Sequence, residues 1–428
     1  MLFNQTLTYI SLFSGAGVGC YGLLEEGFEC VATNEILEKR LNIQRINRKC
    51  KLDESYISGD IKKPETKEKI LKQIGFYSKE FGNDRVDLVV ATPPCQGMSV
   101  ANHKKKNDEI KRNSLVVESV DLIKQIKPRF FILENVPSFY KTGCIDKNDN
   151  LLEIGSMIEQ NLSGDYMLYD EVINFKNFGA NSSRTRTLVI GVCKEFKDFT
   201  SALEFFPDFK QEKTLKEVIG SLKPLTWGEY DSTDFYHSFR TYPKHMQEWI
   251  KDLKEGQSAF ENVQDAISDL AYLCSNEGAF ESDYLNPIQS SYQALMRKDS
   301  PKLYNHQATN HSQAALEKLK LINKEQGKEC LPKNLHGKQQ FKSTWGRLNW
   351  NKISPTIDTR FDTPSNGTNS HPELHRSITP REAARIQSFS DDYIFYGNKT
   401  SVCKQIGNAV PPLLALALGK AILKNLRK

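Results

Sequence analysis

A cysteine preceded by two prolines is the first candidate for chemistry in this chain. Cys95 stands in the stretch ATPPCQGMSVAN (91–102). Pro93 and Pro94 should end the apolar strand before them, because proline fixes φ and removes a backbone donor. The thiol would then lie just past the carboxyl end of a strand, where open parallel sheets bind their ligands. A thiolate is the reactive form of cysteine, so this context favours a nucleophile over an inert buried thiol, the commoner fate of a single cysteine.

An acidic residue and two arginines have a similar placement. Glu134 ends the apolar run of FILENV (131–136), at the same expected sheet edge. A half-desolvated carboxyl there should have a raised pKa and can donate a proton, whereas a helix N-cap or a salt-bridged strand end is the plainer alternative. Arg184 and Arg186 are two residues apart, so in an extended chain both point to one face. Paired guanidinium groups suit a pyrimidine carbonyl, a phosphate or a carboxylate, unless the stretch is a solvated strand edge.

A glycine-rich turn after the first expected strand indicates a cofactor site. LFSGAGVG (12–19) has three glycines spaced two apart, which lets the backbone turn tightly and approach a ligand. The dinucleotide pattern GxGxxG is absent, so we expect a nucleoside cofactor without pyrophosphate; a turn with no ligand is the alternative. Glu35, at the end of the second strand, could bind ribose hydroxyls, and Asp60, after YISG, could accept from an adenine amino group.

The elements that must position these residues alternate between strands and helices. Helical periodicity marks Leu115–Ile126. The alternation predicts an α/β fold with a doubly wound, mostly parallel sheet that is covered on both faces. The expected strands are Leu7–Phe13, Cys30–Thr33, Val86–Ala91, Arg129–Leu133, Tyr166–Phe175 and Thr187–Val192.

The α/β rhythm is lost after about residue 200, which predicts a change of domain. Residues 201–288 have 8 Lys+Arg against 16 Asp+Glu, a net charge of −8, whereas residues 289–345 have 10 against 4, a net charge of +6. Helical patterning returns with TPREAARIQSF and runs to the end of the chain. We therefore expect a catalytic and cofactor-binding domain at 1–200, an inserted domain at 201–345, and a return segment at 346–428.

Composition places the chain among intracellular globular proteins. It has 428 residues, a net charge of only +5, and nine cysteines without a CxxC pair, which argues against a disulfide framework or a structural zinc site. No apolar run is expected to span a membrane, and no signal peptide is evident, so the prediction is a cytoplasmic protein. We expect no metal at NHQATNH (305–311), while HKKKNDEIKR (103–112) is either a solvated loop or a loop that closes over phosphates.

Taken in order, these stretches resemble the C5-cytosine DNA methyltransferase family, of the bacterial or phage restriction-modification type. The pair formed by PPCQ and ENV is highly specific for that family. The resemblance implies an S-adenosylmethionine-dependent methyltransferase fold with a smaller, irregular target-recognition domain at 201–345. The matching stretches, from residue 7 to about 418, are LFSGAGVG, NE, GDI, PPCQGMS, FILENV, SRTR, TPREAARIQSF and QIGNAVPP.

The resemblance also implies a role for each matching position. Cys95 would be the nucleophile and Glu134 its acid partner, while Arg186 would contact the cytosine with support from Arg184. Ser182 departs from the family, which usually has glutamine there, and this puts the support of the arginine pair in question. QIGNAVPP would return to the first domain beside the cofactor pocket. The positions that would bind S-adenosylmethionine are Phe13, Gly15, Gly17, Glu35, Ile36, Asp60, Ile61, Pro93, Leu115, Asn408 and Val410.

The implied reaction is methylation of cytosine C5 in duplex DNA. The Cys95 thiolate would add to C6 of a flipped-out base and Glu134 would protonate N3, so that C5 can accept a methyl group. Two alternatives stay open: a transfer-RNA cytosine methyltransferase and a catalytically inactive DNA-binding relative. Some 145 residues between the catalytic blocks favour duplex DNA. We expect a monomer that needs no membrane; whether a cognate restriction endonuclease acts separately is left open.

Overall fold

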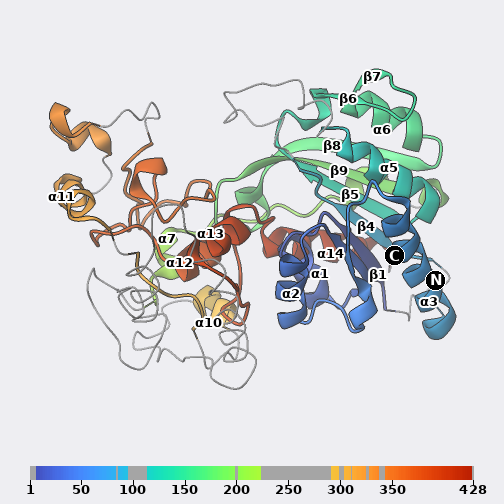
Figure 1. Cartoon of the computed structure of the whole chain (residues 1–428), viewed down its shortest axis with the longest axis horizontal. Helices are drawn as coiled ribbons and strands as arrows, with labels where there is room; N and C mark the ends of the chain where they lie inside the picture. Colours follow the sequence, from blue (N-terminus) through green and yellow to red (C-terminus); the bar gives the residue numbers. More distant parts are fainter. Residues whose placement is uncertain are drawn as a thin grey trace, which may run out of the picture. The chain divides into compact units, whose positions relative to one another are not determined.

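The chain folds into two compact units. The computed structural model describes residues 6–82, 85–94, 113–197, 201–222, 291–297, 303–309, 311–323, 327–336 and 343–426. The first unit, here called the sheet unit, comprises Met1–Lys213 and Asn408–Lys428. The second unit comprises Thr214–Gly407. Figure 1 shows the sheet and its helices in the first unit and short helices in the second.

A seven-stranded sheet with the order β3-β2-β1-β4-β5-β9-β8 forms the centre of the sheet unit. All neighbouring pairs from β3 to β5 are parallel, whereas β9 pairs antiparallel with both β5 and β8. The expected mostly parallel α/β sheet is therefore confirmed, with β9 as the strand that runs against the others. The strands are β1 (Thr8–Leu12), β2 (Glu29–Glu35), β3 (Tyr56–Ser58), β4 (Leu88–Ala91), β5 (Phe130–Asn135), β8 (Tyr166–Asn174) and β9 (Thr185–Cys193).

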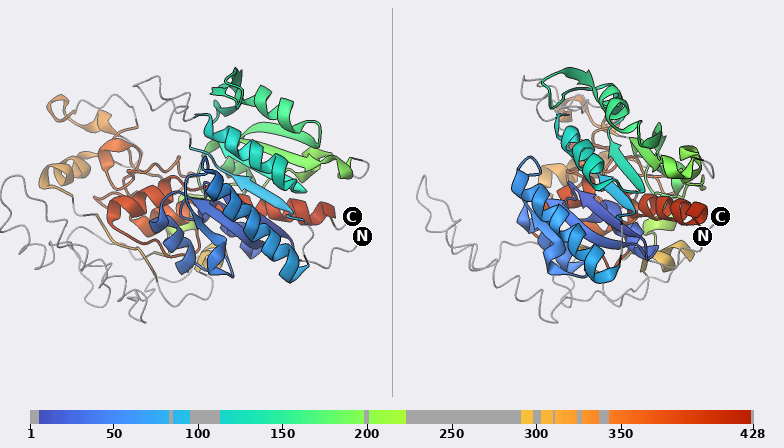
Figure 2. Two further views of the ribbon diagram at one scale, coloured as in Figure 1. Left: turned by 45° about the vertical axis from the view of Figure 1, so that its right-hand side comes forward. Right: turned by 90° about the vertical axis from the view of Figure 1, so that its right-hand side faces the viewer.

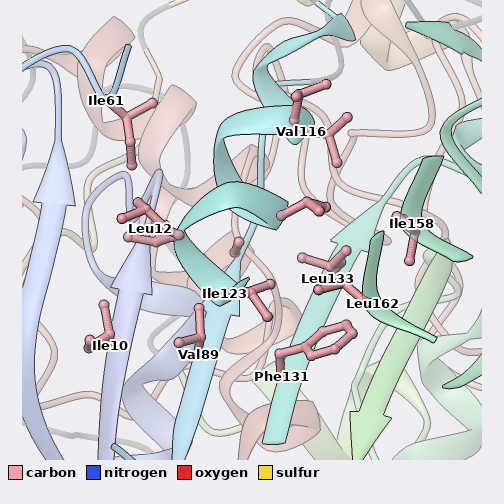
Figure 3. Close-up of a cluster of buried hydrophobic side chains, with 14 of the residues drawn as sticks. Ile10, Leu12, Ile61, Val89, Val116, Ile123, Phe131, Leu133, Ile158 and Leu162 are labelled. Carbon is pink, nitrogen blue, oxygen red and sulfur yellow. The ribbon is translucent and has the colours of Figure 1, made fainter. Parts of the chain in front are cut away.

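Apolar side chains cover both faces of this sheet, because successive residues of a strand point to opposite faces. On β1, Ile10 and Leu12 belong to one buried cluster and Tyr9 to the other. Burial on both faces explains why the strands read as continuous apolar runs. Figure 3 shows the first cluster, in which strand side chains meet those of two helices: Ile10, Leu12, Val89, Phe131 and Leu133 from the strands, and Val116, Ile123, Ile158 and Leu162 from α5 (Leu115–Ile126) and α6 (Ile154–Leu162).

The second face of the sheet is covered by helices from opposite ends of the chain. Helix α14 (Pro412–Leu426) packs against α1 (Tyr21–Glu25), as Figures 1 and 2 show. Gly22 makes this close approach possible, since a Cβ there would lie 2.1 Å from the carbonyl oxygen of Pro412. The glycine-rich first turn and the C-terminal apolar helix are therefore parts of one core.

One apolar stretch is longer than the sequence analysis expected. That analysis predicted no run that could span a membrane, whereas Lys399–Leu426 has the length and composition that could cross one. The structure divides it into α13 (Lys399–Gly407) and α14, and 67% of its most apolar window is buried inside the protein. Burial of this kind is characteristic of a core helix, whose apolar side chains pack against other parts of the protein.

The remaining described elements of the sheet unit connect its strands. Helix α2 (Glu38–Ile46) follows β2, and α3 (Pro64–Phe81) follows β3. A small antiparallel hairpin, β6 (Gly143–Ile145) and β7 (Leu151–Glu153), precedes α6. Because these connections return the chain across the sheet between parallel strands, the carboxyl ends of those strands lie at a single edge of the sheet. The predicted functional residues lie at or near that edge.

Buried charged side chains organise the second unit. Arg376 pairs with both carboxylate oxygens of Glu382 at 2.8 Å, and Arg385 forms an ion pair with Asp391. All four side chains are almost fully buried. Among the described residues of this unit, the α-helices are α7 (Leu215–Ile219), α10 (Ser291–Arg297), α11 (Gln313–Leu321), α12 (Pro380–Ile386) and α13.

The compact units divide the chain differently from the expected domain boundaries. Residues 346–407 belong with the second unit, and the chain returns to the sheet unit only at Asn408. The physical reason is the network around α12, since Arg385 donates to the hydroxyl of Ser221 and Arg381 donates to the carbonyl of Tyr304. These bonds tie the end of the second unit to its beginning and middle.

Candidate active site

Hydrogen bonds join the strand ends at the carboxyl edge of the sheet. The hydroxyl of Thr92, just after β4, donates to the carbonyl of Phe13 after β1 at 3.2 Å. The amide of Asn135, at the end of β5, donates to the carbonyl of Pro93 at 2.9 Å. The stretch that leads to Cys95 is thus attached to both neighbouring strands. Pro93 itself is buried and Pro94 is exposed.

Glu134 is a buried carboxyl at this same edge. Only 8% of the residue is exposed, and its Oε1 lies 3.3 Å from the Nε of Arg186. Burial raises the pKa of the Glu134 carboxyl, and the charges of Arg186 and Arg184 oppose this only in part. A carboxyl whose pKa is raised by desolvation can hold a proton and donate it, as a general acid requires.

The direction of β9 explains why Glu134 and Arg186 meet. Glu134 pairs with Leu188 in the antiparallel ladder, so the beginning of β9 lies beside the end of β5. Arg186 comes two residues before Leu188 and therefore reaches the carboxyl edge of the parallel strands. Arg184 is buried just before β9, and its carbonyl accepts from the amide of Phe175. The two arginines and the glutamate that the sequence predicted are brought together.

Asn135 and Thr187 are site residues that the sequence reasoning missed. Besides its bond to Pro93, Asn135 accepts from the amide of Val136 through its Oδ1 at 2.9 Å. The hydroxyl of Thr187 donates to the carbonyl of Val136 at 3.1 Å. Both residues are buried and lie next to predicted residues in sequence. Asn135 reaches Pro93 because β5 pairs with β4, and Thr187 reaches Val136 because β5 pairs with β9.

The proposed nucleophile cannot be placed in the same way. Cys95 lies outside the described residues and directly follows Pro94, the last described residue of that stretch. The basic stretch 103–112 also lies outside them. Ser182, which stands where the family usually has glutamine, is fully buried.

The glycine turn has the left-handed backbone that its composition suggested. Phe13, Gly15 and Gly17 have φ angles of 54°, 56° and 87°. Gly15 donates its amide to the Oε2 of Glu35 at 2.9 Å, so the acidic end of β2 holds the turn. The Oε1 of Glu35 accepts from Arg40 at 3.0 Å. The turn and the acidic residue that the sequence singled out therefore lie side by side.

A third residue that the sequence reasoning missed lies beneath this turn. Gln44, on α2, is fully buried and donates to the carbonyl of Gly15 at 2.7 Å. A Cβ at Gly17 would lie only 2.6 Å from the Cγ of Gln44, so only glycine permits this contact. Residue spacing gave no signal for Gln44, which lies in an otherwise ordinary helix.

The other predicted cofactor positions are distributed around the turn. Ile36 is 59% exposed directly after β2, and Ile61 is buried. Asp60, after β3, accepts from the amide of Lys62. Val410 lies next to Gly19, where an added Cβ would be 3.2 Å from the Cβ of Val410.

Two predicted positions are less directly connected to the turn. Leu115 begins α5 and packs on the first core cluster. Asn408 is exposed where the chain returns to the sheet unit. Neither contacts the glycine turn through a described hydrogen bond, so their predicted roles rest on the resemblance.

The two histidines of NHQATNH serve the packing of the second unit. The Nδ1 of His306 lies 2.9 Å from the hydroxyl of Thr379, and the Nε2 of His311 accepts from the amide of Ser377. Burial lowers the pKa of His311 to about 4, so its imidazole is neutral at pH 7. Both rings act as hydrogen-bonding groups in a buried environment.

Comparison with known proteins assigns the class. The family described as C-5 cytosine-specific DNA methylase matches residues 7–424. The chain therefore belongs to this family, and it is a DNA (cytosine-5) methyltransferase.

Particular relatives agree with this assignment. The type II methyltransferase M.DdeI of Desulfomicrobium norvegicum is 30% identical over 79% of this chain and 72% of its own length. The type II methyltransferase M1.HphI of Haemophilus parahaemolyticus is 26% identical over 99% of this chain and 88% of its own. A solved structure from E. coli, of a candidate DNA modification methyltransferase encoded within a prophage, has the same fold with a TM-score of 0.62 and 23% identity, covering 99% of this chain and 100% of that one.

Proposed function

We propose that this enzyme transfers the methyl group of S-adenosylmethionine to C5 of a cytosine in a specific duplex DNA sequence, through a transient bond between Cys95 and C6. The observation that carries the proposal is the buried Glu134 carboxyl with its raised pKa, 3.3 Å from Arg186, at the edge where Pro93 leads toward Cys95. Membership of the family supplies the class of reaction.

The chain's own residues would activate the base in two coupled steps. The Cys95 thiolate adds to C6 and forms the C6–S bond, while Glu134 donates its proton to N3 so that negative charge does not build up on the ring. Electron density then lies on C5. The bound S-adenosylmethionine supplies the electrophilic methyl group. Once C5 carries the methyl group, the C5 proton would be lost to solvent, N3 would return its proton to Glu134 and the C6–S bond would break. Cys95 would leave as the thiolate, with 5-methylcytosine and S-adenosylhomocysteine as the products. Arg186 would hold the cytosine and Glu134 in the relative positions that proton transfer to N3 requires.

The residues around the glycine turn fit the proposed cofactor. A Cβ at Gly15 would meet no described atom within 4 Å, so the chain leaves space at the turn. Ile36 offers an exposed apolar side chain that suits one face of adenine. Glu35 would accept from a ribose hydroxyl through its Oε2, which among the described residues accepts only from Gly15 and keeps one lone pair. Its Oε1, in contrast, already accepts from Arg40 and Leu37.

The size of residues 201–345 supports duplex DNA over transfer RNA as the substrate. We infer that residues 289–345, with a net charge of +6, contact phosphates, whereas 201–288, with −8, would repel them. Most of the acidic part lies outside the described residues. Lys320 and Lys333 are exposed, but Lys318 lies over the Trp345 ring at 5.2 Å, where it also contributes to packing. We further propose that the enzyme acts in the cytoplasm and as a monomer.

The covalent step is tested with DNA that carries 5-fluorocytosine at the target. Fluorine cannot leave as the C5 proton does, so the adduct should persist, and peptide mass spectrometry should find it on Cys95. Target sites are first identified by sequencing methylated DNA from a methylation-free host. An adduct on another residue, or none with an enzyme that methylates ordinary DNA, would show that Cys95 is not the nucleophile. Activity on folded transfer RNA but not on duplex DNA would favour the RNA alternative.

A further inference from the structure

The amide of Gln44 holds the glycine turn from below. Its Nε2 donates to the hydroxyl of Ser14 at 2.8 Å and to the carbonyl of Gly15 at 2.7 Å. The side chain is fully buried, and its Cγ is in contact with Gly17. Both donor hydrogens of the amide are therefore used on the turn itself.

A buried threonine and a buried lysine hold the other end of this amide. The Nζ of Lys49 donates to the Oγ1 of Thr33 at 3.1 Å, and that hydroxyl donates to the Oε1 of Gln44 at 2.7 Å. The carbonyl of Gly15 can only accept, so the NH₂ end of the Gln44 amide must face the glycine turn. The carbonyl end of the amide then faces Thr33 and accepts the proton of its hydroxyl. Lys49 is only 3% exposed, so solvent does not compete for this arrangement.

We propose that Gln44 is a positioning residue for the cofactor, held in place by Thr33 and Lys49. The inference rests on the proposed use of S-adenosylmethionine. It adds a residue outside the expected binding positions that determines cofactor affinity. Gly15 and Gly17 have left-handed φ angles, so the turn needs external bonds to keep a single conformation. Gln44 supplies them without lining the base site. Its loss should weaken cofactor affinity and leave DNA affinity unchanged.

If Gln44 served only the packing of the protein, its replacement would have the same effects as the replacement of another buried glutamine. A matched control variant therefore distinguishes the two roles. Gln73, on α3 of the same unit, is also a buried glutamine, and its Nε2 donates to the hydroxyl of Ser55 at 3.1 Å. Replacing Gln44 or Gln73 by methionine removes a buried amide of similar size. If burial of an amide were all that mattered, both variants would show the same change in stability and the same cofactor affinity.

The experiment measures cofactor binding by calorimetry and methyl transfer to duplex DNA in the full-length enzyme. Gln44→Met should raise the Kd for S-adenosylmethionine about tenfold, as expected for the loss of hydrogen bonds that hold the turn. The KM for DNA, and kcat at saturating cofactor, should stay within about twofold of the wild type. Gln73→Met should bind the cofactor as the wild type does. Equal cofactor affinities in the two variants, or an equal rise in the KM for DNA, would overturn the inference.

A second pair of variants tests the hydrogen bond between Thr33 and Gln44 if Gln44→Met is too unstable to assay. Thr33→Val keeps the shape but removes the hydroxyl, so cofactor affinity should fall severalfold, whereas Thr33→Ser should retain it. Equal affinity in these two variants would refute the orienting role. A wild-type enzyme that binds no S-adenosylmethionine and transfers no methyl group would instead contradict the proposed function, which distinguishes the two failures.

Discussion

Replacing Glu134 by glutamine tests the chemistry of the site with little change in shape. The amide can accept a hydrogen bond but cannot transfer a proton to N3. The rate of the chemical step should therefore fall by about 10²–10⁴, the usual contribution of a general acid, or about 3–5 kcal/mol of activation free energy. Binding of DNA should change much less, because the sequence-independent part of affinity comes from phosphate contacts.

The same substitution should change the pH dependence of stability in a defined direction. The folded-state pKa of Glu134 is raised, because burial outweighs the charges of Arg186 and Arg184. Its contribution to wild-type stability is fully present below the ordinary carboxyl pKa and is lost as pH rises through the raised value. Glutamine does not titrate. Relative to the wild type, Glu134→Gln should therefore gain stability as pH rises from about 4.

Two measurements check this reasoning. Single-turnover methyl transfer at saturating cofactor and DNA reports the chemical step, and urea unfolding at a series of pH values reports the free energy of unfolding. In the wild type, kcat/KM should fall as pH rises through the pKa of Glu134, and the variant should lack this limb. A single-turnover rate near that of the wild type, or a stability difference that is constant with pH, would refute the assigned role of the buried carboxyl.

Three other substitutions have expected outcomes. Asn135→Asp removes the donor that holds the stretch before the nucleophile, so single-turnover rates should fall about tenfold or more, with DNA binding retained in a gel-shift assay. Glu382→Gln should destabilise the enzyme by about 3–5 kcal/mol in urea unfolding, because it leaves Arg376 buried without its carboxylate. Since that ion pair lowers the pKa of Glu382 to about 2, its stabilisation is present above the ordinary pKa and lost as pH falls toward 2; a variant with an unchanged acid limb would contradict this. Replacing both Lys320 and Lys333 by glutamine should weaken binding to all DNA sequences and lower the salt slope by about 2, and an unaltered slope would show that this surface does not face phosphates.

The sequence alone was enough to predict the class of fold and the reaction. Apolar runs that end in chemically useful residues predicted the strands: Pro93 follows β4, and Glu134 is the second-to-last residue of β5. This succeeded because strand periodicity and proline chemistry are local properties of the chain. The resemblance to cytosine methyltransferases rested on short motifs in a characteristic order, and the family assignment confirms it.

Only the tertiary structure determined which residues meet. The reversed direction of β9 places Arg186 beside Glu134, and no local pattern distinguishes a parallel from an antiparallel strand of this kind. Gln44 lies beneath Gly15 because α2 packs against the turn. Buried polar side chains acquire their partners from long-range packing, so their roles are decided by which elements pack together and not by the sequence around them.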